Sequence, residues 1–202
     1  MKKAAKVLEE LDPKLQNILV KYLGPETAGN ILTQMSSDEI ADLVKSFTTQ
    51  EAQDFLSKIE ALKAKAVEKL VEYPDDTAGG LMTLDFISVR PSWTAGQAIE
   101  EIKKLSATFR SIVFVYVTEA DGSFKGVVSL RRLLIADPLT EINKLTKAIP
   151  LVSTLRPNDK FRKIIRVMTK YNLYAAAVID LSGKLVGVVT IDDVMRHLFP
   201  NA

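Results

Sequence analysis

Residues 126–134 read GVVSLRRLL, and this stretch has a close counterpart in GVVTIDDVM at residues 187–195. In both copies a β-branched run begins at a glycine and passes directly into a helical pattern. The turn pairs Asp121-Gly122 and Ser182-Gly183 precede the two copies at the same offset of 61 residues. Such pairs are typical of β-hairpins. The second part of the chain is therefore an internal duplication.

The two copies predict the same order of elements. Residues 95–105 and 160–171 have helical periodicity, and each segment follows an Arg-Pro pair. Residues 111–117 and 172–178 are expected to be strands that precede the hairpin turns. Each unit then has the order strand, helix, strand, turn, strand, helix. Two such units that share one core would form a pseudo-symmetric pair with clefts between the copies.

A different and shorter repeat occupies residues 1–60. Apolar residues recur at steps of twelve, as in the column Leu8, Val20, Leu32, Val44 and Leu56. Helix-stop and N-cap signals separate the units at Asp12-Pro13, Gly24-Pro25, Ser36-Ser37 and Thr48-Thr49. Helices this short are stable only when stacked, so the pattern predicts a small helical solenoid. A longer helix over residues 50–72 is expected to close it, with Ala61, Leu62, Ala64, Val67, Leu70 and Val71 on its buried side.

The two parts are joined by residues 73–83, which read YPDDTAGGLMT. Tyr73 precedes a proline and is biased toward an extended conformation, so the preceding helix should end there. The next polar residues, Asp75, Asp76 and Thr77, can cap backbone N–H groups, and the pair Gly79-Gly80 permits positive φ. We expect a joint that fixes an angle between two bodies.

Composition excludes several classes of protein. The 202 residues include no cysteine and one histidine, so disulfide scaffolds, thiolate metal sites and histidine-based catalysis are not expected. The net charge of +2 is too small to indicate nucleic acid. No apolar run reaches the roughly 18–20 residues of a membrane span, and no signal peptide is expected. The absence of cysteine fits a reducing cytoplasm, so a cytoplasmic protein is expected. No nucleophile is paired with a base, so the sequence predicts that the protein is not an enzyme.

The duplicated unit resembles a CBS domain, and the pair resembles a Bateman module. Together with AAKVLEELDP, SSDEIADLV and YPDDTAGGLMT, it makes the whole chain similar to the cytosolic region of MgtE-type magnesium transporters. The resemblance implies an α plus α/β fold, with a helical domain at 1–72, the joint at 73–83 and CBS repeats at 84–140 and 141–202. Relatives of this type continue into a connecting helix and a membrane domain, so either an excised fragment or a free-standing relative is expected.

The resemblance implies a magnesium gauge, in which carboxylates of the helical domain face carboxylates of the CBS pair. The matching positions are Asp38 and Asp42 in the first part and Asp192 and Asp193 in the second. Mg²⁺ needs only one or two carboxylates, and its binding could switch domain packing. Basic residues stand where relatives carry acids, namely Lys6, Lys160, Arg162 and Arg196. We therefore expect weak Mg²⁺ binding and a small response.

A second interpretation is nucleotide binding. Many CBS domains carry a glycine, then Ser or Thr three residues later, then Asp three residues after that. The second repeat matches with Gly187, Thr190 and Asp193. The first repeat has Ser129 but Arg132 in place of the acid, and arginine cannot accept a hydrogen bond from a ribose hydroxyl. Arg131 or Arg132 could still hold a phosphate, so ATP or AMP is the expected ligand.

Three functions follow from these patterns. The leading one is a regulatory module of a magnesium transporter, which closes its domains on a divalent cation. The alternatives are a free-standing Bateman module that binds an adenine nucleotide and regulates a partner protein, and an interaction scaffold without ligands. A homodimer through the CBS helices is expected, because Ile164, Ile165 and Met168 exceed one core face. The basic stripe of Lys163, Arg166 and Lys170 is interpreted as a solvated helix face.

Overall fold

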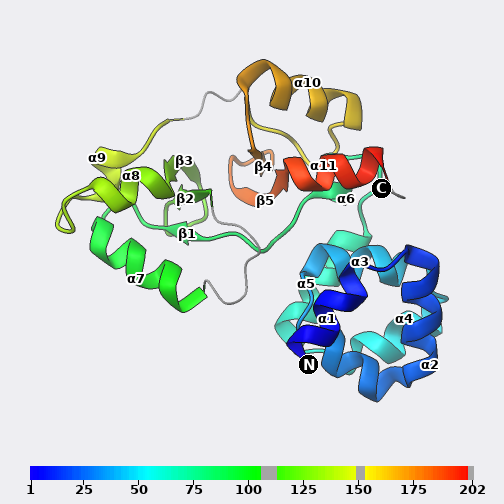
Figure 1. The fold of residues 1–202 in the computed structure, drawn as a ribbon. Coiled ribbons are helices and arrows are strands. Elements are labelled where there is room, and N and C mark those ends of the chain that lie inside the picture. Colours follow the sequence, from blue (N-terminus) through cyan, green and yellow to red (C-terminus); the bar gives the residue numbers. More distant parts are fainter. Residues whose placement is uncertain (106–112, 149–152, 200–202) are drawn as a thin grey trace. The chain divides into compact units, whose positions relative to one another are not determined.

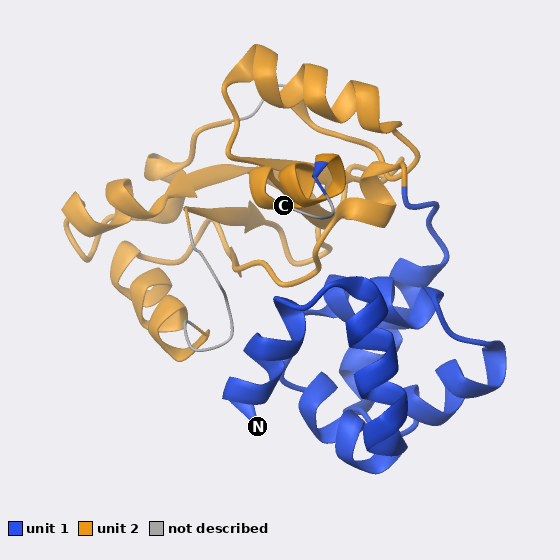
Figure 2. Ribbon diagram, turned by 45° about the vertical axis from the view of Figure 1, so that its right-hand side comes forward, with its two compact units in different colours: residues 1–75, 199–202 blue, residues 76–198 orange. Residues whose placement is uncertain are grey.

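The structure is a computed structural model that describes residues 1–105, 113–148 and 153–199. The chain divides into two compact units, one containing residues 1–75 and the other residues 76–198 (Figure 2). Each unit has its own buried residues and is described separately below.

The first unit consists of short helices (Figure 1): α1 Lys2–Glu9, α2 Pro13–Leu32, α3 Ser37–Lys45, α4 Thr49–Leu56 and α5 Ala61–Val71. Helices α2, α3 and α4 begin where the capping signals predicted. Asp12 accepts a hydrogen bond from the amide of Lys14 at 2.7 Å, and Thr48 forms a reciprocal capping box with Glu51. Gly24, with φ of 71°, interrupts α2 at the predicted boundary. The stacked short helices are thus confirmed.

One helix of this unit was predicted incorrectly. Residues 50–72 form α4 and α5 with a turn between them, because the twelve-residue period continues and buries both Phe55 and Ile59. The turn changes the register of α5. Val67 and Leu70 are buried as expected, whereas Leu62 is 76% exposed.

The first repeat of the second unit contains β1 Ser88–Val89, α7 Ala95–Leu105, β2 Phe114–Thr118, β3 Phe124–Ser129, α8 Leu130–Ile135 and α9 Ile142–Leu145. The sheet order is β1-β2-β3, with β1 parallel and β3 antiparallel to β2. Val115 pairs with Val128, and both are fully buried against α7 and α8 through Ala98 and Leu133.

The second repeat follows the same plan with α10 Phe161–Tyr171, β4 Ala175–Ile179, β5 Leu185–Thr190 and α11 Ile191–Leu198. Strands β4 and β5 are antiparallel. Both predicted helices are confirmed to within one residue. The observed strands β2 and β4 begin three residues later than predicted. In the second repeat the reason is Asn172, which ends α10 in a left-handed conformation with φ of 49°. In the first repeat, residues 111 and 112 lie outside the described residues.

The two repeats meet at the tips of their hairpins. The amide of Phe124 donates to the carbonyl of Gly183 at 3.0 Å, and the amide of Leu185 donates to the carbonyl of Gly122 at 3.1 Å. Both glycines have positive φ, which confirms the predicted turns. A shared buried cluster lies beside these contacts and contains Tyr116, Val127, Ala177 and Val188. The pair therefore shares a buried cluster between its two sheets, next to the separate core of the first repeat.

The joint differs from its predicted conformation. Residues Ala78–Leu81 form a one-turn helix, α6, and neither Gly79 nor Gly80 has positive φ. The hydroxyl of Thr77 accepts from the amide of Gly80 at 3.2 Å, which confirms its capping role. The amides of Ala78 and Gly79 donate to carbonyls of residues 159 and 157 just before α10. These backbone bonds attach the joint to the second unit.

Candidate functional site

A cavity of about 230 Å³ lies between the two repeats of the second unit. Its wall is aromatic, with Phe86 and Phe114 next to the partly exposed Tyr174. Thr190 and Asp192 border it from the second repeat and supply a hydroxyl and a carboxylate. A cavity with an aromatic wall and a few polar groups is suited to a ligand that combines a planar ring with hydroxyl groups.

Tyr116 lines the same cavity from strand β2 and belongs to the shared core. Burial raises the pKa of its phenol. A phenol is protonated at neutral pH even without this shift, so Tyr116 is a hydrogen-bond donor in the cavity lining.

Asp193 was predicted to bind both nucleotide and metal, but its carboxylate is held by its own helix. Oδ2 accepts from the amide of Thr190 at 2.9 Å and from its hydroxyl at 2.6 Å, while that hydroxyl accepts from the Asp193 amide at 3.3 Å, so the two residues form a capping box on α11. Oδ1 accepts from Arg196 at 2.7 Å, and the side chain is only 9% exposed. Asp193 is absent from the described cavity lining, whereas its neighbour Asp192 is present.

Gly187 has a packing role next to the joint. A Cβ atom at this position would lie 2.4 Å from Sδ of Met82, whose side chain is fully buried. The glycine thus permits a close approach of the joint to β5. Among the described residues that line the cavity, Gly187 is absent.

The first repeat places its motif differently. The hydroxyl of Ser129 accepts from the amide of Arg132 at 3.2 Å and caps α8. Arg131 and Arg132 are exposed on the first turn of that helix. Ser129 and Arg131 are not among the described residues around the cavity, so the structure does not bring them together with Thr190.

The predicted metal residues of the first unit lie on α3. Asp42 is exposed, and Nζ of Lys45 lies 3.8 Å from its Oδ1 while also pairing with Asp75. Sequence reasoning missed Lys45, although its three-residue spacing from Asp42 was a signal. The Lys45 side chain is only 16% exposed, and its ammonium group supplies a positive charge close to two carboxylates. Asp38 lies one turn earlier on the same helix.

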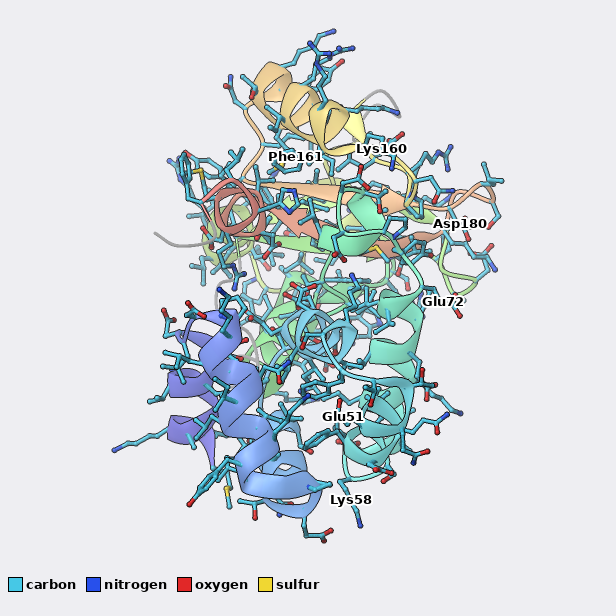
Figure 3. The ribbon with its side chains drawn as sticks, turned by 90° about the vertical axis from the view of Figure 1, so that its right-hand side faces the viewer. Glu51, Lys58, Glu72, Lys160, Phe161 and Asp180 are labelled. Atoms are coloured by element: carbon cyan, nitrogen blue, oxygen red, sulfur yellow. The ribbon has the colours of Figure 1, made fainter. Side chains whose placement is uncertain are left out.

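A second ion pair, between exposed side chains, is formed within the second unit. Nζ of Lys160 is 3.0 Å from both carboxylate oxygens of Asp76, and the amide of Phe161 donates to the Asp76 carbonyl. Figure 3 labels Lys160 and Phe161 at the start of α10. Within residues 1–105, 113–148 and 153–199, no group of three His, Asp or Glu side chains could hold a metal ion.

Comparison with protein families gives two matches that together span most of the chain. A family model of the MgtE intracellular N domain matches residues 1–76, and the CBS domain matches residues 78–138 and 144–200. Magnesium transporter MgtE of Thermus thermophilus is 33% identical over 97% of this chain and 44% of its own length. The Bacillus subtilis transporter is 27% identical over 94% of this chain and 42% of its own. The chain thus spans less than half of these relatives.

Solved structures give the same result. The cytosolic domain of the Mg²⁺ channel MgtE in complex with ATP matches with a TM-score of 0.88 and 32% identity, over 97% of this chain and 79% of that one. The soluble part of a magnesium transporter matches with a TM-score of 0.90 and 26% identity, over 100% and 78% of the two chains. In the part of the chain that the structure describes, no helix has the length and hydropathy needed to cross a bilayer.

Proposed function

This chain belongs to the MgtE family, as an MgtE intracellular N domain followed by two CBS domains, and on that basis we propose that it is the cytoplasmic regulatory part of a magnesium transporter. The observation that carries the proposal is the match over nearly the whole chain to the cytosolic domain of the Mg²⁺ channel MgtE. It regulates by responding to a divalent cation, and its membrane partner is the transporter domain.

The carboxylates that would sense Mg²⁺ are Asp38 and Asp42 in the first unit and Asp192 and Asp193 in the second. Two of them already have internal cations, since Lys45 lies beside Asp42 and Arg196 pairs with Asp193. A hydrated Mg²⁺ ion must compete with these cations for the carboxylate oxygens. Binding is therefore weak, with a dissociation constant in the millimolar range or higher. This corresponds to a binding free energy on the order of −4 kcal/mol or less favourable. The response is a change in how the two units pack.

The purified chain tests this directly. Small-angle X-ray scattering during titration with MgCl₂ would follow the radius of gyration, and a NaCl series at equal ionic strength is the control. We expect compaction at millimolar Mg²⁺ and none in NaCl. Equal scattering in both series up to tens of millimolar would refute Mg²⁺ sensing by this chain.

A second function, nucleotide binding, is favoured by the cavity between the CBS repeats. The cavity is lined by aromatic side chains together with Thr190, Asp192 and Tyr116. A similar solved structure is a complex with ATP. We propose that an adenine nucleotide occupies this cavity, with Asp192 rather than Asp193 as the carboxylate from the second repeat, next to Asp85 from the segment before β1. Calorimetric titration with ATP and AMP tests this. Absence of heat at millimolar nucleotide would leave the cation response or a scaffold role.

We also propose that the chain dimerises through its CBS helices, but with a different surface from the one expected. Ile164 and Met168 belong to the core of their own repeat, since their side chains are 0% and 3% exposed. Leu134 on α8 and Met195 on α11 occupy equivalent positions in the two repeats and are 65% and 47% exposed. These pseudo-symmetric apolar side chains are suited to an isologous contact with a second copy.

A further inference from the structure

The outer face of helix α10 carries only positive charges. Residues 160–171 contain no acid, and their basic side chains are all exposed, namely Lys160, Arg162, Lys163, Arg166 and Lys170. The opposite face is apolar and packs into the second repeat through Ile164, Val167 and Met168. Figure 3 shows several side chains that leave α10 on the side away from the strands and end in nitrogen.

Only part of this charge is neutralised within the second unit. Lys163 pairs with Asp159 at 2.8 Å, and Lys160 pairs with Asp76 at 3.0 Å. Within the described part of the chain, no carboxylate lies at ion-pair distance from Arg162, Arg166 or Lys170. These three are spaced at i, i+4 and i+8, so they form one line along the helix.

The equivalent helix of the first repeat shows that the fold does not require such a face. Helix α7 alternates its charges, and Glu100 pairs with Lys103 at 2.6 Å while Glu101 pairs with Lys104 at 3.5 Å. Both helices pack one apolar side into their repeat and expose the other. The uniform positive charge therefore distinguishes α10 from its counterpart α7.

We propose that the outer face of α10, through Arg162, Arg166 and Lys170, binds an anionic phospholipid surface. The face offers mainly charge, and the aromatic ring next to it, that of the half-buried Tyr171, lies 5.3 Å from Nζ of Lys170. A cluster of large apolar and aromatic anchors, which usually dominates binding to a protein partner, is not formed by Arg162, Arg166 and Lys170. Stacking aromatics, which single-stranded nucleic acids use, are likewise absent from this line of residues. The choice of the bilayer rests on the proposed function, since a transporter's regulatory part works next to its membrane.

The expected strength follows from the number of unneutralised charges. Each basic residue near an anionic leaflet contributes about fivefold to the partition coefficient. Three such residues contribute about a hundredfold, which is weak for a free protein but sufficient for one that is already tethered nearby. The attraction should be lost in high salt, because the charges are exposed and screened.

Vesicle co-sedimentation of the full chain tests the proposal. We would compare pure phosphatidylcholine vesicles with vesicles containing about a third phosphatidylglycerol, at low NaCl and without Mg²⁺. We expect partition only into the anionic vesicles and its loss at about 0.5 M NaCl, well above the physiological ionic strength of roughly 0.15 M. The variant R162Q/R166Q/K170Q should lower the partition coefficient by about a hundredfold. Glutamine keeps helix propensity, so circular dichroism should show an unchanged fold.

The matched control is K2Q/K3Q/K6Q, which removes the same charge from the exposed side of α1. It should stay close to the unsubstituted chain. The proposal is overturned by absence of partition, by equal losses in both variants, or by tight binding of a nucleic-acid oligomer that the α10 variant abolishes while lipid does not bind. None of these results depends on the Mg²⁺ titration, so failure of the proposed regulatory function would be seen separately.

Discussion

The guanidinium of Arg196 donates to Oδ1 of Asp193 across 2.7 Å, one helical turn away on α11. With Oδ2 already held by Thr190, both oxygens of this carboxylate are engaged. A divalent cation that approaches Asp193 therefore meets a positive charge in direct contact with its ligand. For the proposed Mg²⁺ site, we therefore expect Arg196 to lower the cation affinity at Asp193.

Replacing this arginine should strengthen Mg²⁺ binding. Arg196→Gln removes one unit of repulsion at contact distance and frees Oδ1, so we expect roughly a tenfold lower dissociation constant. The midpoint of Mg²⁺-dependent compaction would measure it. Arg166→Gln removes an equal charge from an exposed position on α10 and serves as the control. An unchanged midpoint in R196Q would show that Asp193 binds no cation.

Nucleotide binding should depend on the carboxylate that borders the cavity. Asp192→Asn removes one of the two carboxylates, with that of Asp85, that line the cavity, so we expect at least several-fold weaker binding if the Asp192 carboxylate accepts a ribose hydroxyl. Asp193→Asn should change nucleotide affinity little, because the Asp193 carboxylate is bonded to Thr190 and Arg196 and Asp193 is not among the described residues that line the cavity. The same variant should abolish the Mg²⁺ response. Calorimetry with ATP separates the two variants. The reverse order would restore Asp193 as the nucleotide ligand predicted from the motif.

Local capping chemistry made much of the first unit predictable. Asp12 and Thr48 were identified as N-caps because their side chains bond amides two or three residues away, which sequence spacing specifies. The turn after Leu56 was missed because it contains neither glycine nor proline. Gly79 was expected to permit positive φ because it is a glycine. Its amide instead donates to the carbonyl of residue 157, and the residue lies in the helical turn α6.

The candidate site was predicted less well than the fold, because long-range packing decides it. The motif indicated Thr190 as a ligand, and Thr190 borders the cavity. It assigned ligand roles to Gly187, whose small size accommodates Met82, and to Asp193, whose carboxylate is used by Arg196. The aromatic wall could not be identified, because Phe86 and Tyr174 are brought together only by the pairing of the two repeats.

Adding a methyl group at Gly187 should destabilise the second unit. Gly187→Ala places a Cβ against the buried side chain of Met82, and overpacking of this kind costs about 1–3 kcal/mol. Urea denaturation would measure it. The double variant M82A/G187A should lose less stability than the sum of its single variants, because shortening the Met82 side chain leaves room for the new methyl. Full stability of G187A with weaker ATP binding would instead support a ligand role.

The carboxyls of the two hairpin turns should make stability depend on pH. Hydrogen bonds from the amide of Ser123 lower the pKa of Asp121, and those from the hydroxyl of Ser182 and the amide of Lys184 lower the pKa of Asp180. A lowered pKa means that this stabilisation is present above the unfolded value, which is about 3.9, and is lost as pH falls through the folded value. Urea midpoints of the native chain and of D121N/D180N should therefore differ near neutral pH, and the difference should shrink as pH falls below about 3.9.

Glu68→Gln on α5 is the control for that experiment, since it removes an exposed carboxyl outside the hairpins. We expect its urea midpoint to follow the native chain at both pH values. A difference between the native chain and D121N/D180N that stays constant throughout the acid range would contradict the proposed titration of the turns.

Charge on the apolar side chains of α8 and α11 should prevent dimerisation. Leu134 and Met195 are equivalent and exposed, and a self-complementary contact brings each against the partner copy. Leu134→Glu with Met195→Glu would place like charges in an apolar contact, which opposes association through desolvation and repulsion. Sedimentation velocity at tens of micromolar should show a dimer for the native chain and a monomer for the double variant. Leu181→Glu is the control, because Leu181 is 96% exposed at a hairpin tip away from both helices. A monomeric native chain would refute the dimer, and a dimeric double variant would move the interface elsewhere on the CBS pair.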